Sequence, residues 1–198
     1  YGVFGKPTNV NNTESFASIP WILQHGGQAF ANLGVAGSGG SKLFSVSGHV
    51  EKPGNYEVNM GMPFTELLAM AGGIWKGRNL KAVIPGGPST AVMPAAAILE
   101  ATMDYNGLGK AGSSLGAGSM IVMDETTCMV KALKRLSYFF YEESCGQCTP
   151  CREGTGWVYR VIKRITDGEG KMEDLDLLTD ISNNISGRTI CALGDAAA

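Results

Sequence analysis

Apolar and polar residues alternate in two short stretches after residue 40, and this pattern predicts strands. Leu43-Phe-Ser-Val-Ser47 and Tyr56-Glu-Val58 both have the two-residue period of half-buried strands. The turn-rich stretch 48–54 joins them as a hairpin. Apolar runs at 80–84 and 119–123 predict two more strands, and a short helix begins at Pro63 between the two pairs. Two strands, a helix and two strands is the order of a β-grasp fold.

After residue 125 the apolar period becomes that of a helix. Three helices are predicted from this spacing: 129–140, 150–165 and 172–185, the last with Leu175 facing inward. A fourth helix is expected to start at Arg188. Short helices that pack side by side form a bundle. We therefore predict an α+β protein, with a β-grasp domain at 42–125 followed by a helical bundle at 126–198.

The first 41 residues predict a loop, a helix and a linker. Asn12 and Thr13 precede apolar positions at helical spacing, and either is suited to cap a helix. Pro20 lies inside this helix and is expected to bend it unless it falls in the first turns. Glycine and serine dominate residues 35–41, which predicts a flexible linker between two units. The chain starts at Tyr1 rather than at methionine, and we interpret it as a piece of a longer protein.

Charge and hydropathy exclude two classes of function. The net charge of −2 gives no indication of nucleic-acid binding. Apolar runs fall short of the ~20 residues that a membrane-spanning helix needs, so we expect no transmembrane segment.

The strongest chemical signal in the chain comes from Cys145, Cys148 and Cys151, which are separated from one another by two intervening residues. Ligands at this spacing can surround one compact inorganic centre, and Cys191 can supply a fourth thiolate. Four cysteines are the ligand set of a 4Fe-4S cluster. A structural zinc site also accepts four cysteines, usually as two separated pairs, and it stays open as the alternative. Disulfides are disfavoured because the cysteine count of 5 is odd and no secretory signal is present.

Residues around the cysteines favour a metal centre. Thr149 and Pro150 are typical of a helix N-cap and first helical position, which puts Cys151 in the first turn, near outward-pointing N–H groups. Gly146 allows the backbone to pass close to a cluster. The fifth cysteine, Cys128, is expected to be a small buried residue, and we assign no role to His49.

Several stretches together resemble the flavin- and NADH-binding subunit of respiratory complex I. They cover nearly the whole chain in the order of that family: Phe4-Gly-Lys-Pro-Thr-Asn-Val-Asn-Asn-Thr-Glu14, Ser47-Gly-His-Val-Glu-Lys-Pro-Gly54, Glu143-Ser-Cys-Gly-Gln-Cys-Thr-Pro-Cys-Arg-Glu-Gly154 and Thr189-Ile-Cys-Ala-Leu-Gly-Asp195. The resemblance implies that residues 1–34 end a flavin-binding domain. It also implies that 42–125 is a soluble-ligand-binding β-grasp insert.

The resemblance implies electron transfer from NADH through FMN to a 4Fe-4S cluster held by the four cysteines. It further implies two groups of FMN contacts: Val10, Asn11, Asn12 and Ser15 in the first, and Ala192 and Leu193 in the second. From the residues alone, the two asparagines are more simply turn and cap residues. The glycine-rich nucleotide loop of the family is missing from these 198 residues, so this stretch alone is expected to bind neither NADH nor, tightly, FMN.

The same resemblance implies partners and a location. The partners are other subunits of the peripheral arm, especially one that carries a 2Fe-2S cluster, and the location is the cytoplasmic side of a bacterial inner membrane or the mitochondrial matrix side. Two other functions stay open. One is a diaphorase subunit of an NAD-dependent hydrogenase or formate dehydrogenase, and the other is a docking module stabilised by zinc.

Overall fold

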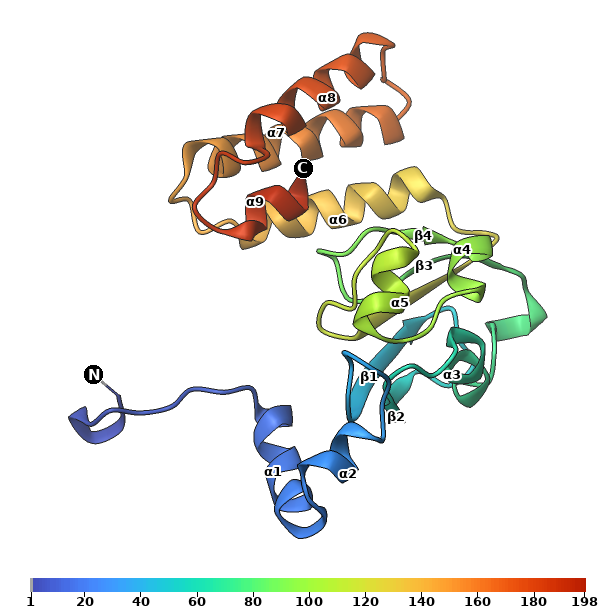
Figure 1. Ribbon diagram of the computed structural model, residues 1–198. Coiled ribbons are helices and arrows are strands. Elements are labelled where there is room, and N and C mark those ends of the chain that lie inside the picture. The colour runs from blue at the N-terminus through green and yellow to red at the C-terminus, as the bar shows by residue number, and fades with distance from the viewer. Residues whose placement is uncertain (1) are drawn as a thin grey trace.

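The computed structural model describes residues 2–198 and has α+β architecture (Figure 1). A five-stranded mixed sheet occupies the middle of the molecule, with two N-terminal helices at one end and four C-terminal helices at the other. In the part of the chain that is described, no helix combines the length and the apolar character needed to cross a bilayer.

The sheet has the strand order β2-β1-β5-β3-β4. The strands are β1 (Ser41–Gly48), β2 (Gly54–Asn59), β3 (Leu80–Ile84), β4 (Met93–Pro94) and β5 (Ser119–Asp124). The central pair β1 and β5 is parallel, with Val46 opposite Met120, and the other pairs are antiparallel. The four predicted strands are confirmed, and the two-residue strand β4 was not predicted.

Alternate residues of the sheet feed two separate apolar clusters. Val83 of β3 joins the main core, in which Phe44 and Leu67 are fully buried. Its neighbours Ala82 and Ile84 point to the other face, where α6 packs on them. Helices on the main-core face are α3 (Phe64–Met70), α4 (Ala95–Leu99) and α5 (Tyr105–Lys110). The sheet is therefore covered on both faces, and α6 connects it to the C-terminal helices.

The N-terminal helices are held by polar contacts. They are α1 (Thr13–His25) and α2 (Gly27–Ala31), preceded by the single turn η1 (Val3–Gly5). Asn12 caps α1 as predicted, because its side chain accepts a hydrogen bond from the N–H of Glu14 at 2.8 Å. The Glu14 carboxylate in turn bonds Lys42 Nζ at 2.9 Å and the N–H of Leu43 at 2.6 Å. Every residue of α1 and α2 is at least partly exposed, so this carboxylate anchors α1 to β1.

The expected flexible linker is a packed turn. Val35 and Ser38 exchange two backbone hydrogen bonds of 3.0 and 2.9 Å, and the carbonyl of Gly40 accepts one from Met60. A Cβ on Gly34 would lie 2.2 Å from the Ser38 oxygen, so this glycine permits a close approach of two backbones. Glycine therefore permits close packing in this segment, and the division of the chain at residues 35–41 stays a prediction.

Helices α6 (Met129–Glu143), α7 (Thr149–Thr166), α8 (Glu173–Ile185) and α9 (Ala192–Ala197) form the C-terminal part. A buried cluster of α7 and α8 residues holds these two helices together: Val158, Val161, Ile162, Ile181 and Ile185. The short α9 contacts α6, α7 and α8. Two details of the prediction were wrong: Leu175 is 54% exposed, and the last helix begins at Ala192 instead of Arg188.

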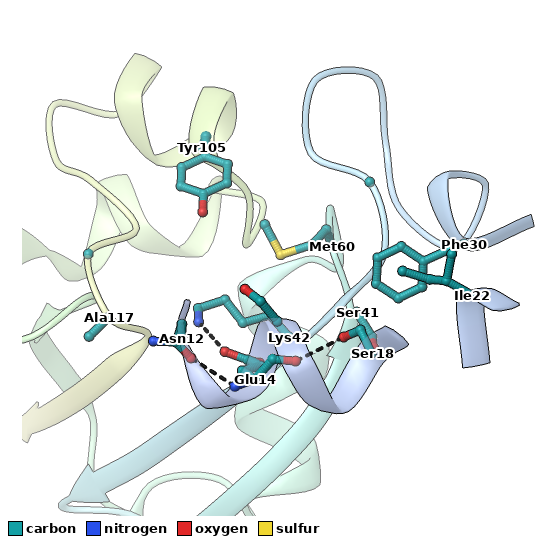
Figure 2. Close-up of a pocket in the computed structure, with 13 residues that line it drawn as sticks. Asn12, Glu14, Ser18, Ile22, Phe30, Ser41, Lys42, Met60, Tyr105 and Ala117 are labelled. Carbon is teal, nitrogen blue, oxygen red and sulfur yellow. Dashed lines mark hydrogen bonds and ion pairs between the residues drawn. The ribbon is translucent and has the colours of Figure 1, made fainter. Parts of the chain in front are cut away.

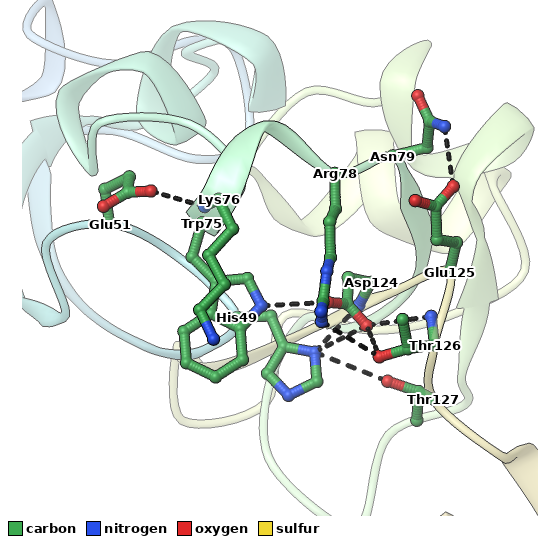
Figure 3. A network of polar contacts seen from close by, with 10 residues as sticks. All are labelled: His49, Glu51, Trp75, Lys76, Arg78, Asn79, Asp124, Glu125, Thr126 and Thr127. Atoms are coloured by element: carbon green, nitrogen blue, oxygen red, sulfur yellow. Dashed lines mark hydrogen bonds and ion pairs between the residues drawn. The ribbon is translucent and has the colours of Figure 1, made fainter.

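The buried carboxylate of Asp124, at the end of β5, is the centre of a network of polar contacts (Figure 3). Asp124 accepts hydrogen bonds from Trp75 Nε1 at 2.8 Å, from Arg78 at 3.0 Å and from both the N–H and the hydroxyl of Thr126. Its own N–H donates to His49 Nδ1 at 3.1 Å, and the His49 ring stacks on Trp75. Burial raises the pKa of Asp124, but the hydrogen bonds outweigh burial and hold this pKa far below its usual range. His49, to which the sequence assigned no role, thus belongs to a structural network.

Candidate metal centre

The cysteine loop runs from the end of α6 to the first turn of α7. Cys145 is exposed, Cys148 is half-buried and Cys151 is buried. Gly146 between the first two has φ of 79°, a left-handed conformation that favours glycine. The loop therefore turns sharply, and its three thiols range from exposed to buried.

The start of α7 differs from the prediction by one residue. Cys148 occupies the N-cap position, Thr149 is the first helical residue, and Pro150 lies in the first turn. Cys151 is in that first turn, as predicted. The Arg152 side chain is half exposed, and its guanidinium donates to the carbonyl of Gly146 at 3.0 Å, which ties the loop to α7.

The fourth predicted ligand approaches this loop from the other end of the C-terminal part. The N–H of Ile190 donates to Cys148 Sγ at 3.4 Å, which brings the residue before Cys191 against the loop. Cys191 is the exposed N-cap residue of α9. Two segments that are distant in the sequence therefore meet at a sulfur atom.

Cys151 has a polar neighbour that the ligand spacing does not reveal. Ser144 Oγ lies 3.3 Å from Cys151 Sγ and also accepts a hydrogen bond from the N–H of Gly146 at 3.4 Å. Ser144, Ile190 and Arg152 are the contacts that the sequence analysis missed. Ser144 directly precedes the first cysteine, but sequence adjacency gives no signal that it bonds the third.

The spacing of the predicted ligands bears on the kind of centre that they could hold. Within residues 2–198, no three cysteine, histidine or carboxylate side chains come close enough together to bind one metal ion. A 4Fe-4S cluster takes one thiolate on each of its irons, so its ligands stand farther apart than those of a single ion. That Cys145, Cys148, Cys151 and Cys191 hold such a cluster stays a prediction.

The predicted FMN contacts lie in two separate places. Asn12 and Ser15 line a cavity of about 530 Å³ between α1, the start of β1 and Tyr105 (Figure 2). Val10 is 91% exposed and Asn11 is exposed too, both in the segment that precedes α1.

The second group of predicted FMN contacts, Ala192 and Leu193, lines a different cavity of about 590 Å³ beside Phe139 and Phe140 of α6. Figure 1 shows α1 and α9 at opposite ends of the molecule. The structure therefore does not bring the two groups together, and their contact with a flavin stays a prediction.

Cys128 is exposed, so its assignment as a buried residue was wrong. It occupies the N-cap position of α6, where the chain leaves the sheet. A hydrogen bond from the backbone N–H of Lys131 lowers the pKa of its thiol. The apolar run that suggested burial begins only at the next residue.

Known proteins resemble this chain in sequence and in structure. Residues 131–198 match the family described as the NADH-ubiquinone oxidoreductase-F iron-sulfur binding region, and residues 42–109 match the SLBB domain. The F subunits of NADH-quinone oxidoreductase from Rickettsia bellii (strain OSU 85-389) and from Rhodobacter capsulatus are both 50% identical over 100% of this chain. The alignments cover 48% and 46% of those relatives, so the chain spans about half the length of the curated relatives it matches.

A solved structure shares the fold. A chain of the NAD+-reducing NiFe hydrogenase, in its H2-reduced state, superposes with a TM-score of 0.86 at 30% identity. The match covers 99% of this chain and 33% of the hydrogenase chain. Along its whole length this chain is thus similar to the F subunits of NADH-quinone oxidoreductase, and residues 131–198 match the family model of the NADH-ubiquinone oxidoreductase-F iron-sulfur binding region.

Proposed function

We propose that this chain holds a 4Fe-4S cluster on Cys145, Cys148, Cys151 and Cys191 and transfers electrons within an NADH:quinone oxidoreductase. When bound, the cluster accepts and releases one electron at a time, because its charge spreads over several irons and sulfurs. The chain's own residues hold the thiolates in place and donate hydrogen bonds to sulfur.

One contact carries this proposal, the hydrogen bond from the N–H of Ile190 to Cys148 Sγ. It joins the segment of the fourth cysteine to the loop of the other three. The buried Cys151 and the exposed Cys145 lie at the two ends of that loop. This arrangement supports a centre that is partly enclosed by α6, α7 and α9 and open on the side of Cys145.

The same proposal divides the chain as the sequence analysis did. Residues 1–34 end a flavin-binding domain, 35–41 connect, 42–125 form a β-grasp domain of the soluble-ligand-binding type, and 126–198 form a helical bundle. The parallel central pair between two antiparallel pairs and the match to the SLBB domain support the β-grasp assignment. The packing of α6 on α7 and of α7 on α8 supports the bundle.

The complete protein would take electrons from NADH through FMN. Its partners would be other peripheral-arm subunits, including one with a 2Fe-2S cluster, on the cytoplasmic side of the inner membrane or the matrix side of a mitochondrion. Asn12 and Ser15 at one cavity and Leu193 at another are available for flavin contacts only if further residues complete each site. The 198 residues alone are therefore proposed to bind neither NADH nor, tightly, FMN.

A diaphorase subunit of an NAD-reducing hydrogenase is the second candidate. The structural match at a TM-score of 0.86 favours it, but the identity of 30% is well below the 50% shared with the quinone oxidoreductase subunits. The third candidate is a docking module held by zinc. It predicts zinc in place of iron and sulfide, so metal analysis distinguishes it from the first two candidates.

Metal analysis and electron paramagnetic resonance test the proposal. Anaerobically prepared protein is expected to be brown, with equal amounts of iron and sulfide, and to give a low-temperature signal when reduced. Cys191→Ser is expected to abolish or strongly alter that signal, whereas the matched control Cys128→Ser leaves it unchanged. A colourless protein with one zinc, or a signal that survives in Cys191→Ser, contradicts the proposal.

A further inference from the structure

Ser144 supplies a hydroxyl to a sulfur atom that solvent hardly reaches. It is the C-cap residue of α6, and its Oγ lies 3.3 Å from Cys151 Sγ. Cys151 is only 7% exposed. A buried thiolate needs hydrogen-bond donors from the protein, because water cannot provide them. The Ser144 hydroxyl is therefore placed to donate to Cys151 Sγ the hydrogen bond that water would donate to an exposed sulfur.

Iron binding fixes the direction of this hydrogen bond. A free thiol and a hydroxyl can each donate to the other. A cysteine bound to iron is deprotonated, so its sulfur can only accept. The N–H of Gly146 already donates to Ser144 Oγ at 3.4 Å, which occupies one acceptor position and leaves the hydroxyl hydrogen for the sulfur.

The loop holds Ser144 in this orientation. Arg152 bonds the carbonyl of Gly146, and Gly146 has the left-handed backbone that turns the chain after Cys145. The hydroxyl thus comes from a segment tied at both ends, to α6 and to α7. A preorganised donor changes the properties of a ligand more than a mobile one.

We propose that Ser144 is a positioning residue that sets the reduction potential of the cluster through Cys151. The inference rests on the proposed function, because it needs the cluster. Hydrogen bonds to cluster sulfurs are among the factors that determine cluster potentials. A donor stabilises the reduced state, in which the sulfurs carry more negative charge, and so it raises the potential. A second donor is the backbone N–H of Ile190, which bonds Cys148 Sγ. Because it is a backbone group, substitution of the Ser144 side chain leaves it in place.

A redox titration of the cluster-loaded protein, followed by electron paramagnetic resonance, tests the inference. Ser144→Ala removes the donor, and it is expected to shift the reduction equilibrium about tenfold toward the oxidised state. For one electron this corresponds to a midpoint potential lower by ~59 mV. Ser144→Thr keeps a hydroxyl and is expected to restore the wild-type potential.

The matched control is Ser137→Ala on the same helix. Its hydroxyl bonds the carbonyl of Leu133 at 2.8 Å and contacts no sulfur in the described structure, so its removal should leave the potential unchanged. An unchanged potential in Ser144→Ala, with the cluster signal intact, overturns the inference. An equal shift in Ser137→Ala also overturns it, since the effect would then come from helix α6 as a whole.

A second measurement needs no variant. Resonance Raman bands of the iron–cysteine bonds in the wild-type protein should shift after exchange into D2O, because donors to sulfur become deuterated. Bands that stay in place contradict the inference even if Ser144→Ala fails to bind iron. A wild-type protein without any cluster signal instead removes the proposed function, and the inference with it.

Discussion

Gly154 sets how closely α7 approaches α8, and an alanine at this position tests the packing of the two helices. An ideal Cβ on Gly154 would lie 2.7 Å from both Cγ1 and Cδ1 of Ile185. Ile185 is fully buried, in the cluster that holds the helices together. Because real Cβ atoms essentially never come within 3.0 Å of another heavy atom, Gly154→Ala forces α7 or Ile185 to move.

Two effects of opposite sign determine the size of the change in stability. Alanine favours a helix interior by about 1 kcal/mol over glycine. An added methyl group in a well-packed core costs about 1–3 kcal/mol. The difference predicts that Gly154→Ala lowers the free energy of unfolding by about 0–2 kcal/mol.

Gly109 provides a matched control. It is also a helical glycine, in α5, but an ideal Cβ there meets no heavy atom within 4 Å. Only the helix propensity acts at this site, so Gly109→Ala is expected to raise the free energy of unfolding by about 0.5–1 kcal/mol. The same substitution thus has opposite expected effects at the two positions.

A double-mutant cycle identifies the atoms responsible. Ile185→Ala removes both clashing carbons and by itself costs about 2–5 kcal/mol. The methyl group of Gly154→Ala then occupies part of the vacated space, so the double variant should lose less stability than the sum of the two single variants.

Urea unfolding followed by circular dichroism measures each free energy from the midpoint and the slope. Two results refute the reasoning. One is a Gly154→Ala protein stabilised as much as Gly109→Ala. The other is a cycle that is additive within ~0.5 kcal/mol.

Three further predictions concern polar groups. The pKa of Asp124 is lower in the folded than in the unfolded protein, so its contribution to stability is present above about pH 4 and is lost on acidification below that value. Asp124→Asn should therefore weaken the acid dependence of stability measured by urea unfolding, and the exposed Asp176→Asn should retain it. Glu14→Gln removes the charge that anchors α1 and should speed amide hydrogen exchange throughout α1, whereas exchange in β5 and the control Glu66→Gln should match wild type. In the cluster-loaded protein, Cys128 is expected to react first with iodoacetamide because it is exposed and the N–H of Lys131 lowers its pKa; a fast phase that persists in Cys128→Ser would contradict this.

The strands and long helices followed from local patterns because each has a strong period. Phe44 and Val46 are each followed by a serine, and both are buried in β1 as the two-residue period requires. Positions next to helix ends were less predictable. Cys128 and Cys148 are N-cap residues without the side-chain oxygens that normally mark such positions. The start of α7 was therefore predicted one residue too late, and Cys128 was expected to be buried.

Contacts between distant segments could not be predicted from the sequence. The spacing of the four cysteines predicts one ligand set, but the contact of Ile190 with Cys148 joins residues with no common pattern. The same is true of His49 and Asp124, which are far apart in the sequence and meet because β1 and β5 are neighbours in the sheet. Leu175 is exposed although its spacing placed it on the inward face of α8, because that spacing does not tell how far neighbouring helices extend over the face.

The carboxylate of Asp124 lies at the junction between the sheet and α6, and this position has a mechanical consequence. Apolar surfaces can slide over each other, whereas hydrogen bonds of defined direction resist rotation. The bonds from Trp75, Arg78 and Thr126 converge on this one group from different sides. The end of β5 and the segment that carries Trp75 and Arg78 are therefore held in a fixed relative orientation, directly before the chain enters α6.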